Sequence, residues 1–260
     1  MVGNYAGFSA KKHNVPNITK FRVLPQGLLQ QLGVAADAKI LLCVHGFHSD
    51  PGSFLRQCGS YTGSHLAIPI VWSCSRECGF PCAYLRDRRD LVVRAATELP
   101  HLVGLFGDTG ASIMCHSMGN YFLQTLITGG NGDICPYIGK FRDVFMVAAD
   151  VERSIFNMAD IAQLVTHNVH VLHSKRDWAM TARRFTNSFR EALGARGYDE
   201  NNVRFNQQDK LVKINCMRYQ ADGCADHNYA FSDDAIKYYD KQYNIQVADE
   251  QAAAAVTAND

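Results

Sequence analysis

The chain has 260 residues, of which 47% are hydrophobic and 20% charged, with 26 Lys and Arg against 25 Asp and Glu. This composition excludes the disordered and fibrous classes, and a chain of this length buries a full core without disulfides or a structural metal. The basic run at residues 86–89 is interrupted by Asp87. The balanced charge therefore argues against nucleic acid as a partner.

The expected elements alternate between short apolar runs and longer helical patterns. Such alternation is typical of βαβ units, and it predicts an α/β fold with a mostly parallel sheet and helices on both faces. Near-continuous apolarity indicates that most strands are covered on both sides. The expected strands are Lys39–Val44, Ile68–Ser73, Ala111–His116, Asp143–Ala149, Val169–His173 and Leu211–Cys216. The expected helices run from Arg86 to about Phe106, Gly119 to Thr128, Ser154 to about Thr166, Met180 to Gly194, and Ser232 to about Tyr243.

These elements fit one domain over residues 1–246. Residues 247–260 are Ala-rich and polar without periodicity, so we expect a disordered tail. The segment from Asp150 to Val169 has room for one helix, which predicts no large cap domain. The stretch from Cys74 to Tyr84 is the expected source of a small cap.

The nine cysteines are scattered along the chain, and their odd number favours a reducing compartment. Cys74, Cys78 and Cys82 have the spacing C-x3-C-x3-C, which is wider than the pairs typical of zinc sites, so we expect no metal and no cofactor. The N-terminus lacks the pattern of a signal peptide, and no segment is apolar over the length that a bilayer requires. We therefore expect a cytoplasmic protein without a transmembrane segment.

A candidate nucleophile follows the third expected strand, in the sequence C-H-S-M-G at residues 115–119. It departs from the G-x-S-x-G motif at its first position, where Cys115 replaces Gly. In that motif the Ser occupies a strained turn between strand and helix, and the last Gly lets the helix approach the strand. The pattern predicts Ser117 as a nucleophile, and a strand-to-helix turn with a capping Ser is the alternative interpretation. His116 is expected to pack beneath the turn or to line the pocket.

A second motif, V-H-G-F-H at residues 44–48, follows the first expected strand. Acyl transfer places negative charge on the carbonyl oxygen, and two backbone N–H groups usually stabilise it. We expect these donors to be Phe47 and Met118. His45 is expected to hold the backbone of the loop, whereas His48 either lines the pocket or faces solvent.

Two further loops carry a carboxylate and a histidine. Asp177 follows the expected strand Val169–His173, and His227 follows the last expected strand. The chain order Ser117, Asp177, His227 is that of the α/β-hydrolases and not that of chymotrypsin or subtilisin. Asp150 also follows an expected strand and is the alternative acid.

These motifs together resemble a largely uncharacterised family of esterase- or lipase-like α/β-hydrolases, over roughly residues 38–235. Members of that family look like V-H-G-F-N in the oxyanion loop and A-H-S-M-G-N at the nucleophile, with S-x-x-D-x-A-L and G-H-S/N further on. The matching segments here are 42–47, 84–87, 114–120, 174–179 and 226–229. The resemblance implies Ser117 as nucleophile, Asp177 as acid and His227 as base. Cys115 and His48 depart from the family pattern.

The predicted function is hydrolysis of a carboxylic ester or thioester through a Ser-His-Asp triad and an acyl-enzyme. The partner is then a small-molecule ester or a lipid-like substrate, and the protein is expected to be a monomer or a weak homodimer. The altered first position of the motif keeps a second hypothesis open. In that hypothesis the chain is a non-catalytic, hydrolase-like protein that binds a small molecule.

Overall fold

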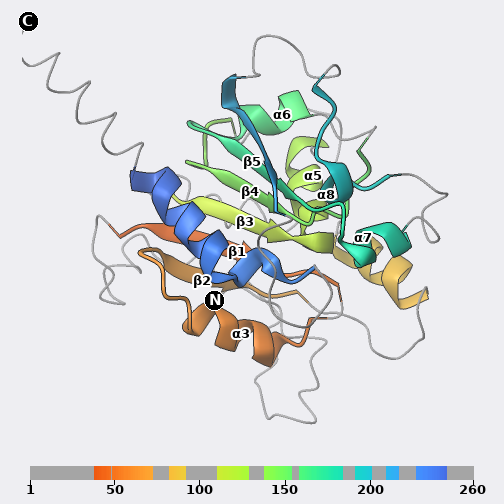
Figure 1. Cartoon of the computed structure of the whole chain (residues 1–260). Helices are drawn as coiled ribbons and strands as arrows, with labels where there is room; N and C mark the ends of the chain where they lie inside the picture. The colour runs from red at the N-terminus through yellow and green to blue at the C-terminus, as the bar shows by residue number, and fades with distance from the viewer. Residues whose placement is uncertain are drawn as a thin grey trace, which may run out of the picture.

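The structure is a computed structural model, and it describes residues 38–47, 49–72, 82–91, 110–128, 138–153, 158–183, 191–200, 209–216 and 227–244. A six-stranded parallel sheet forms its centre, with the strand order β2-β1-β3-β4-β5-β6 (Figure 1). The strands are β1 Ile40–Val44, β2 Leu66–Ile70, β3 Ser112–His116, β4 Val144–Val147, β5 Val169–His173 and β6 Leu211–Asn215. This arrangement confirms the expected α/β class.

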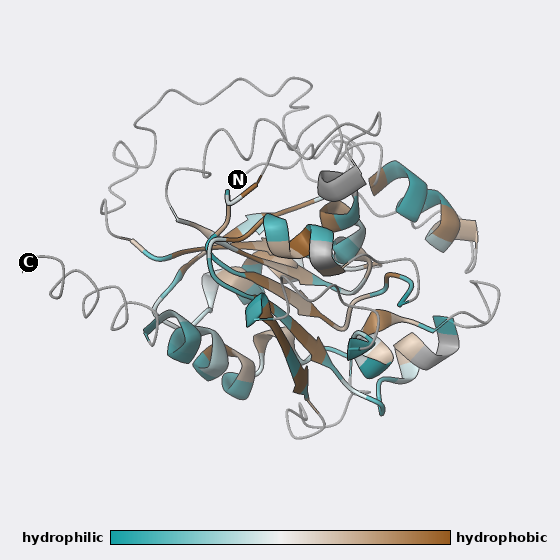
Figure 2. Cartoon of the chain, turned by 90° about the horizontal axis from the view of Figure 1, so that it is seen from above, coloured by the Kyte–Doolittle hydropathy of each residue, from teal (hydrophilic) through white to brown (hydrophobic). Residues whose placement is uncertain are grey.

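Helices cover both faces of the sheet (Figure 1). One face packs against α3 and the helix at 233–244, and the other packs against α5 and α6. The helices are α3 Pro51–Gly59, α5 Asn120–Thr128, α6 Met158–Gln163, α7 Trp178–Ala182 and α8 Leu193–Arg196, with two more at residues 82–91 and 233–244. Short 3-10 turns lie at η2 Ser117–Gly119 and η6 Tyr229–Phe231. Seen from above, the strands are mostly hydrophobic, whereas the helices carry both hydrophilic and hydrophobic residues (Figure 2).

The alternation of side chains along β1 shows why this layered packing forms. Leu42 and Val44 belong to the core beneath α5, whereas Leu41 and Cys43 belong to the core beneath α3. Both sets are buried, as expected for a strand that is covered on both faces. The outer strands β2 and β6 are partly exposed, because each pairs with one other strand among the described residues.

The sheet has a topological switch point between β1 and β3. From β1 the chain steps to β2 on one side and then returns to β3 on the other, so Val44 lies between Ile70 and Cys115 in the register. Loops that leave the carboxyl ends of two such strands diverge and open a crevice, where ligands of α/β proteins bind.

Some predicted boundaries were wrong. The second strand is Leu66–Ile70 rather than Ile68–Ser73, because the backbone of Trp72 bonds to the ring of His45 instead of continuing the ladder. The helix expected from Arg86 already begins by residue 82, within the stretch expected to form a small cap. The rest of that stretch lies outside the described residues.

The helix predicted from Met180 to Gly194 is also interrupted. Ala192 forms a β-bridge with Glu152, and Gly194 donates to the carbonyl of Ala149 at 2.8 Å, so this part of the chain is held against the end of β4. The helix expected from Ser154 ends at Gln163. The expected tail at 247–260 lies outside the described ranges, and none of the described helices has the length and apolarity to cross a membrane.

Candidate active site

The candidate residues converge on the carboxyl edge of the sheet. Gly46 and Phe47 follow β1, and Ser117 follows β3. Asp177 follows β5, and His227 comes after β6. Because parallel strands all end at the same edge, residues that are distant in the sequence meet there.

Ser117 occupies a sharp turn between β3 and α5. Its φ is +52°, in the left-handed region that residues with a side chain seldom adopt. The turn fits because Gly119 lies against β1: a Cβ on Gly119 would be 2.7 Å from the carbonyl oxygen of His45. Gly46 is equally tight, since a Cβ there would lie 2.7 Å from the Cβ of Ser117. Two glycines thus allow the turn at Ser117 and the loop after β1 to contact each other.

The carbonyl group of Ser117 accepts hydrogen bonds from Asn120 and from the backbone of Asp150. Nδ2 of Asn120 donates to it at 2.9 Å and also to the carbonyl of Cys115 at 2.9 Å. The backbone N–H of Asp150 donates to the same Ser117 oxygen at 3.1 Å. These bonds offset the cost of the strained φ, which is about 1–3 kcal/mol for such a residue. Asn120 follows the Ser motif in the sequence, but its position alone gave no role for the amide.

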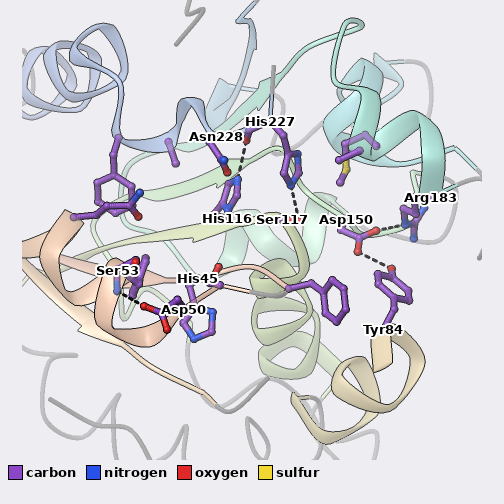
Figure 3. A pocket seen from close by; sticks show the side chains of 18 of the residues that line it. His45, Asp50, Ser53, Tyr84, His116, Ser117, Asp150, Arg183, His227 and Asn228 are labelled. Atoms are coloured by element: carbon purple, nitrogen blue, oxygen red, sulfur yellow. Dashed lines mark hydrogen bonds and ion pairs between the residues drawn. The ribbon is translucent and has the colours of Figure 1, made fainter. Parts of the chain in front are cut away.

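A chain of hydrogen bonds joins Ser117, His227 and Asp177. Oγ of Ser117 lies 3.0 Å from Nε2 of His227, and Nδ1 of His227 lies 2.8 Å and 3.0 Å from the two oxygens of Asp177. A carboxylate can only accept, so Nδ1 carries the ring proton and donates it to Asp177. Nε2 then offers its lone pair to the hydroxyl of Ser117, which donates to it (Figure 3).

Asp177 is fully buried and is itself fixed by its helix. Its Oδ1 accepts the N–H of Met180 at 3.0 Å in the first turn of α7. This cap holds one carboxylate oxygen in place while Oδ2 makes the shorter contact with His227. The orientation of the histidine therefore depends on the start of α7.

Asp150, the alternative acid, has different partners. The hydroxyl of Tyr84 donates to its Oδ2 at 2.6 Å, and the guanidinium of Arg183 forms an ion pair with its Oδ1 (Figure 3). Burial raises the pKa of Asp150, and the charge of Arg183 opposes that change. Arg183 also donates to the hydroxyl of Tyr121 at 3.2 Å. The sequence did not predict these contacts of Asp150, because no sequence motif connects Arg183 with the end of β4.

The loop after β1 is held by His45, as its position suggested. Its Nδ1 donates to the carbonyl of Gly46 at 2.8 Å, and its Nε2 accepts the N–H of Trp72 at 3.1 Å. The ring stacks on that of Trp72, with 4.9 Å between the centroids. Burial lowers the pKa of His45 to about 4, so the ring stays neutral and keeps both bonds.

The other expected site residues lie around the same point. Phe47 lines the cavity, and its ring contacts that of Tyr84 edge to face. Met118 is the second residue of η2, where the first N–H groups have no partner within the turn. His116 lines the cavity and binds the backbone carbonyl of His227 at 2.9 Å. His48 lies outside the described residues.

A cavity of about 710 Å³ opens above Ser117. It is bordered on one side by α3 and Phe231, and on the other by Tyr84, α7 and Arg183. Trp178 lines it while keeping 58% of its surface exposed. A cavity of this size fits a small organic substrate with Ser117 at its floor.

The thiols give no sign of a reactive centre in the described part of the chain. Burial raises the pKa of Cys115 well above its usual value, so its thiol is protonated and unreactive. Cys82 is exposed, and Cys74 and Cys78 of the C-x3-C-x3-C segment lie in a range that the structure does not describe. No set of three potential metal ligands occurs among the described residues.

A parallel sheet with a Ser in a strained turn at its switch point is characteristic of an α/β hydrolase. A profile of the family described as "alpha/beta hydrolase of unknown function (DUF900)" matches residues 25–246 of the chain. The protein therefore belongs to this family. Comparison with curated proteins and with solved structures gave no match.

Proposed function

We propose that the protein is a serine hydrolase that cleaves a carboxylic ester or thioester through an acyl-enzyme. The observation that carries the proposal is the hydrogen-bonded series Ser117–His227–Asp177, with Ser117 at a φ of +52° on the cavity floor. Membership of an α/β-hydrolase family supports hydrolysis in general, and the ester or thioester bond is the more specific part of the proposal.

The proposed reaction begins when His227 accepts the Ser117 proton at Nε2 while Oγ attacks the acyl carbon. The imidazolium that forms is stabilised by Asp177, which accepts from Nδ1 at 2.8 Å. In our proposal the N–H groups of Phe47 and Met118 stabilise the oxyanion. His227 then returns the proton to the leaving group, and a water molecule activated in the same way releases the acid.

The borders of the cavity favour an uncharged, partly apolar substrate. Phe47, Phe54 and Phe231 line it together with the exposed ring of Trp178. Aromatic surface next to a nucleophile stabilises the acyl or alcohol portion of an ester by burial, at about 25 cal/mol for each Å² removed from water. A small lipid-like ester fits these borders.

The test is hydrolysis of p-nitrophenyl esters of short and medium chain length by the native protein and by Ser117→Ala. We expect the substitution to lower kcat by at least about 10³-fold with folding unchanged, because it removes the nucleophile itself. Thioesters of the same acyl chains, followed with a thiol reagent, decide between the two bond types. Equal rates in the native protein and the variant would refute the proposal.

A fluorophosphonate probe separates this function from that of a non-catalytic binding protein. An activated Ser117 reacts covalently with the probe, and Ser117→Ala should not be labelled. A folded native protein that binds small esters in the cavity, but is neither labelled nor active, would establish the binding function instead.

A further inference from the structure

His116 lies between two parts of the site that come from different regions of the chain. It is the last residue of β3, next to Ser117, and its side chain lines the cavity. Its Nε2 is 2.9 Å from the backbone carbonyl oxygen of His227, as the dashed line in Figure 3 shows. Its ring also contacts the ring of His227, with 4.8 Å between the centroids. One side chain thus contacts both the backbone and the ring of the proposed base.

The bond to His227 determines the protonation of the His116 ring. A carbonyl oxygen only accepts, so Nε2 of His116 must carry the proton and donate it. Nδ1 then has a free lone pair in the neutral ring. This atom faces the loop after β1, because a Cβ added to Gly46 would lie 3.2 Å from it. The His116 ring therefore fills the space between the His227 loop and the loop that carries Phe47.

The charge of the His116 ring affects His227, the proposed base, because the two rings are in contact. Burial, followed by the nearby charge of His227, lowers the pKa of His116 to about 3. A neutral ring can donate to the carbonyl without placing a second positive charge beside the imidazolium that His227 becomes during the reaction.

We propose that His116 is a positioning residue, which sets the distance of the His227 loop from Ser117 through its Nε2–H bond to the His227 carbonyl. This inference rests on the proposed serine-hydrolase function. Further along, the hydroxyl of Tyr229 fixes the same segment by donating to the carbonyl of Leu172 at 3.2 Å. The bond from His116 acts on His227 itself, and so it controls where Nε2 lies relative to Oγ.

Two amide substitutions form a matched pair for the test. In His116→Gln, the side-chain amide nitrogen takes the place of Nε2 and can still donate to His227. In His116→Asn, the amide nitrogen takes the place of Nδ1, and the donor no longer reaches the carbonyl. A displacement of His227 by about 1 Å would cost up to roughly 100-fold in rate, so we expect kcat to fall about 10–100-fold in His116→Asn. In Gln, kcat should remain within about threefold, and KM should change little in either variant.

A second measurement does not depend on turnover. Nitrogen-15 NMR of the histidine rings in the native protein should show His116 protonated at Nε2 and bare at Nδ1 from about pH 5 to pH 8. The low-field Nδ1–H proton of His227, bonded to Asp177, should persist in His116→Gln and weaken in His116→Asn. Absence of esterase activity in the native protein would count against the proposed function alone, since the ring protonation would still be observed. An Nδ1–H tautomer or a charged ring at His116 would overturn the positioning role, as would equal kcat values in the two variants.

Discussion

Replacing Asp177 by Asn tests which carboxylate orients the base. Oδ1 of Asp177 accepts the N–H of Met180 at 3.0 Å, so the amide oxygen of an Asn must take this position. The amide nitrogen then occupies the place of Oδ2, which lies 2.8 Å from Nδ1 of His227. Since that nitrogen donates, Nδ1 must become the acceptor and the ring proton moves to Nε2. A protonated Nε2 cannot accept the proton of Ser117.

The expected loss in kcat is therefore about 10³–10⁴-fold, the scale seen when the acid of a serine-protease triad is made an amide. This corresponds to roughly 4–5.5 kcal/mol of transition-state stabilisation, at about 1.36 kcal/mol per factor of ten. The assay is ester hydrolysis, accompanied by urea unfolding to show that the variant remains folded.

Asp150→Asn is the matched control for the acid assignment. It removes the charge that compensates Arg183 in a buried pair, so we expect a loss of about 3–5 kcal/mol in the free energy of unfolding. Its kcat, measured where the variant is folded, should fall less than that of Asp177→Asn. If Asp177→Asn kept more than a tenth of the native kcat while Asp150→Asn lost most of it, the assignment would be reversed.

Two further predictions concern packing and pH. Gly119→Ala places a Cβ 2.7 Å from the backbone oxygen of His45, so the free energy of unfolding should fall by about 1–3 kcal/mol. Gly59→Ala is the control, because its Cβ would meet nothing within 4 Å. Its midpoint of chemical denaturation should be unchanged or higher. Burial, helped by Lys213, lowers the pKa of His173 in the folded protein to about 4, below the value of about 6.5 in an unfolded chain. Between these pH values the unfolded chain binds more protons, so the stability falls with decreasing pH by up to about 1.4 kcal/mol per pH unit for this residue. Between pH 7 and pH 5, the free energy of unfolding of His173→Leu should therefore fall by roughly 1–2 kcal/mol less than that of the native protein. Chemical denaturation at the two pH values measures this difference, and an equal fall in the two proteins would contradict the prediction.

The fold was largely predictable because its central strands are buried on both sides. The run Val169–His173 matches β5 at both ends, and the residues of β1 are apolar without interruption. Boundaries were less predictable where distant parts of the chain determine them. The end of β2 depends on the ring of His45, and the interruption before α8 depends on the end of β4. Neither contact leaves a pattern within a window of the sequence.

In the site, too, the features set by local motifs were predictable, and those set by contacts between distant segments were not. Motifs at strand ends were enough to predict that Ser117, Asp177 and His227 lie close together, since parallel strands end at one edge. The partners of Asp150 were not predictable in this way. Tyr84 and Arg183 come from helices about 100 residues apart in the sequence, and only the folded chain brings their side chains to one carboxylate.

The distinct partners of Asp177 and Asp150 explain how two buried carboxylates at neighbouring strand ends can have different roles. Asp177 accepts the uncharged N–H group of Met180 and the ring N–H of His227, so it would stabilise a positive charge on His227. Asp150 faces Arg183, and the charge of this guanidinium already compensates it. Moving the base toward Asp150 would set His227 against Arg183 as a second cation for one carboxylate. The ion pair therefore favours Asp177 over Asp150 as the partner of His227, the base in our proposal.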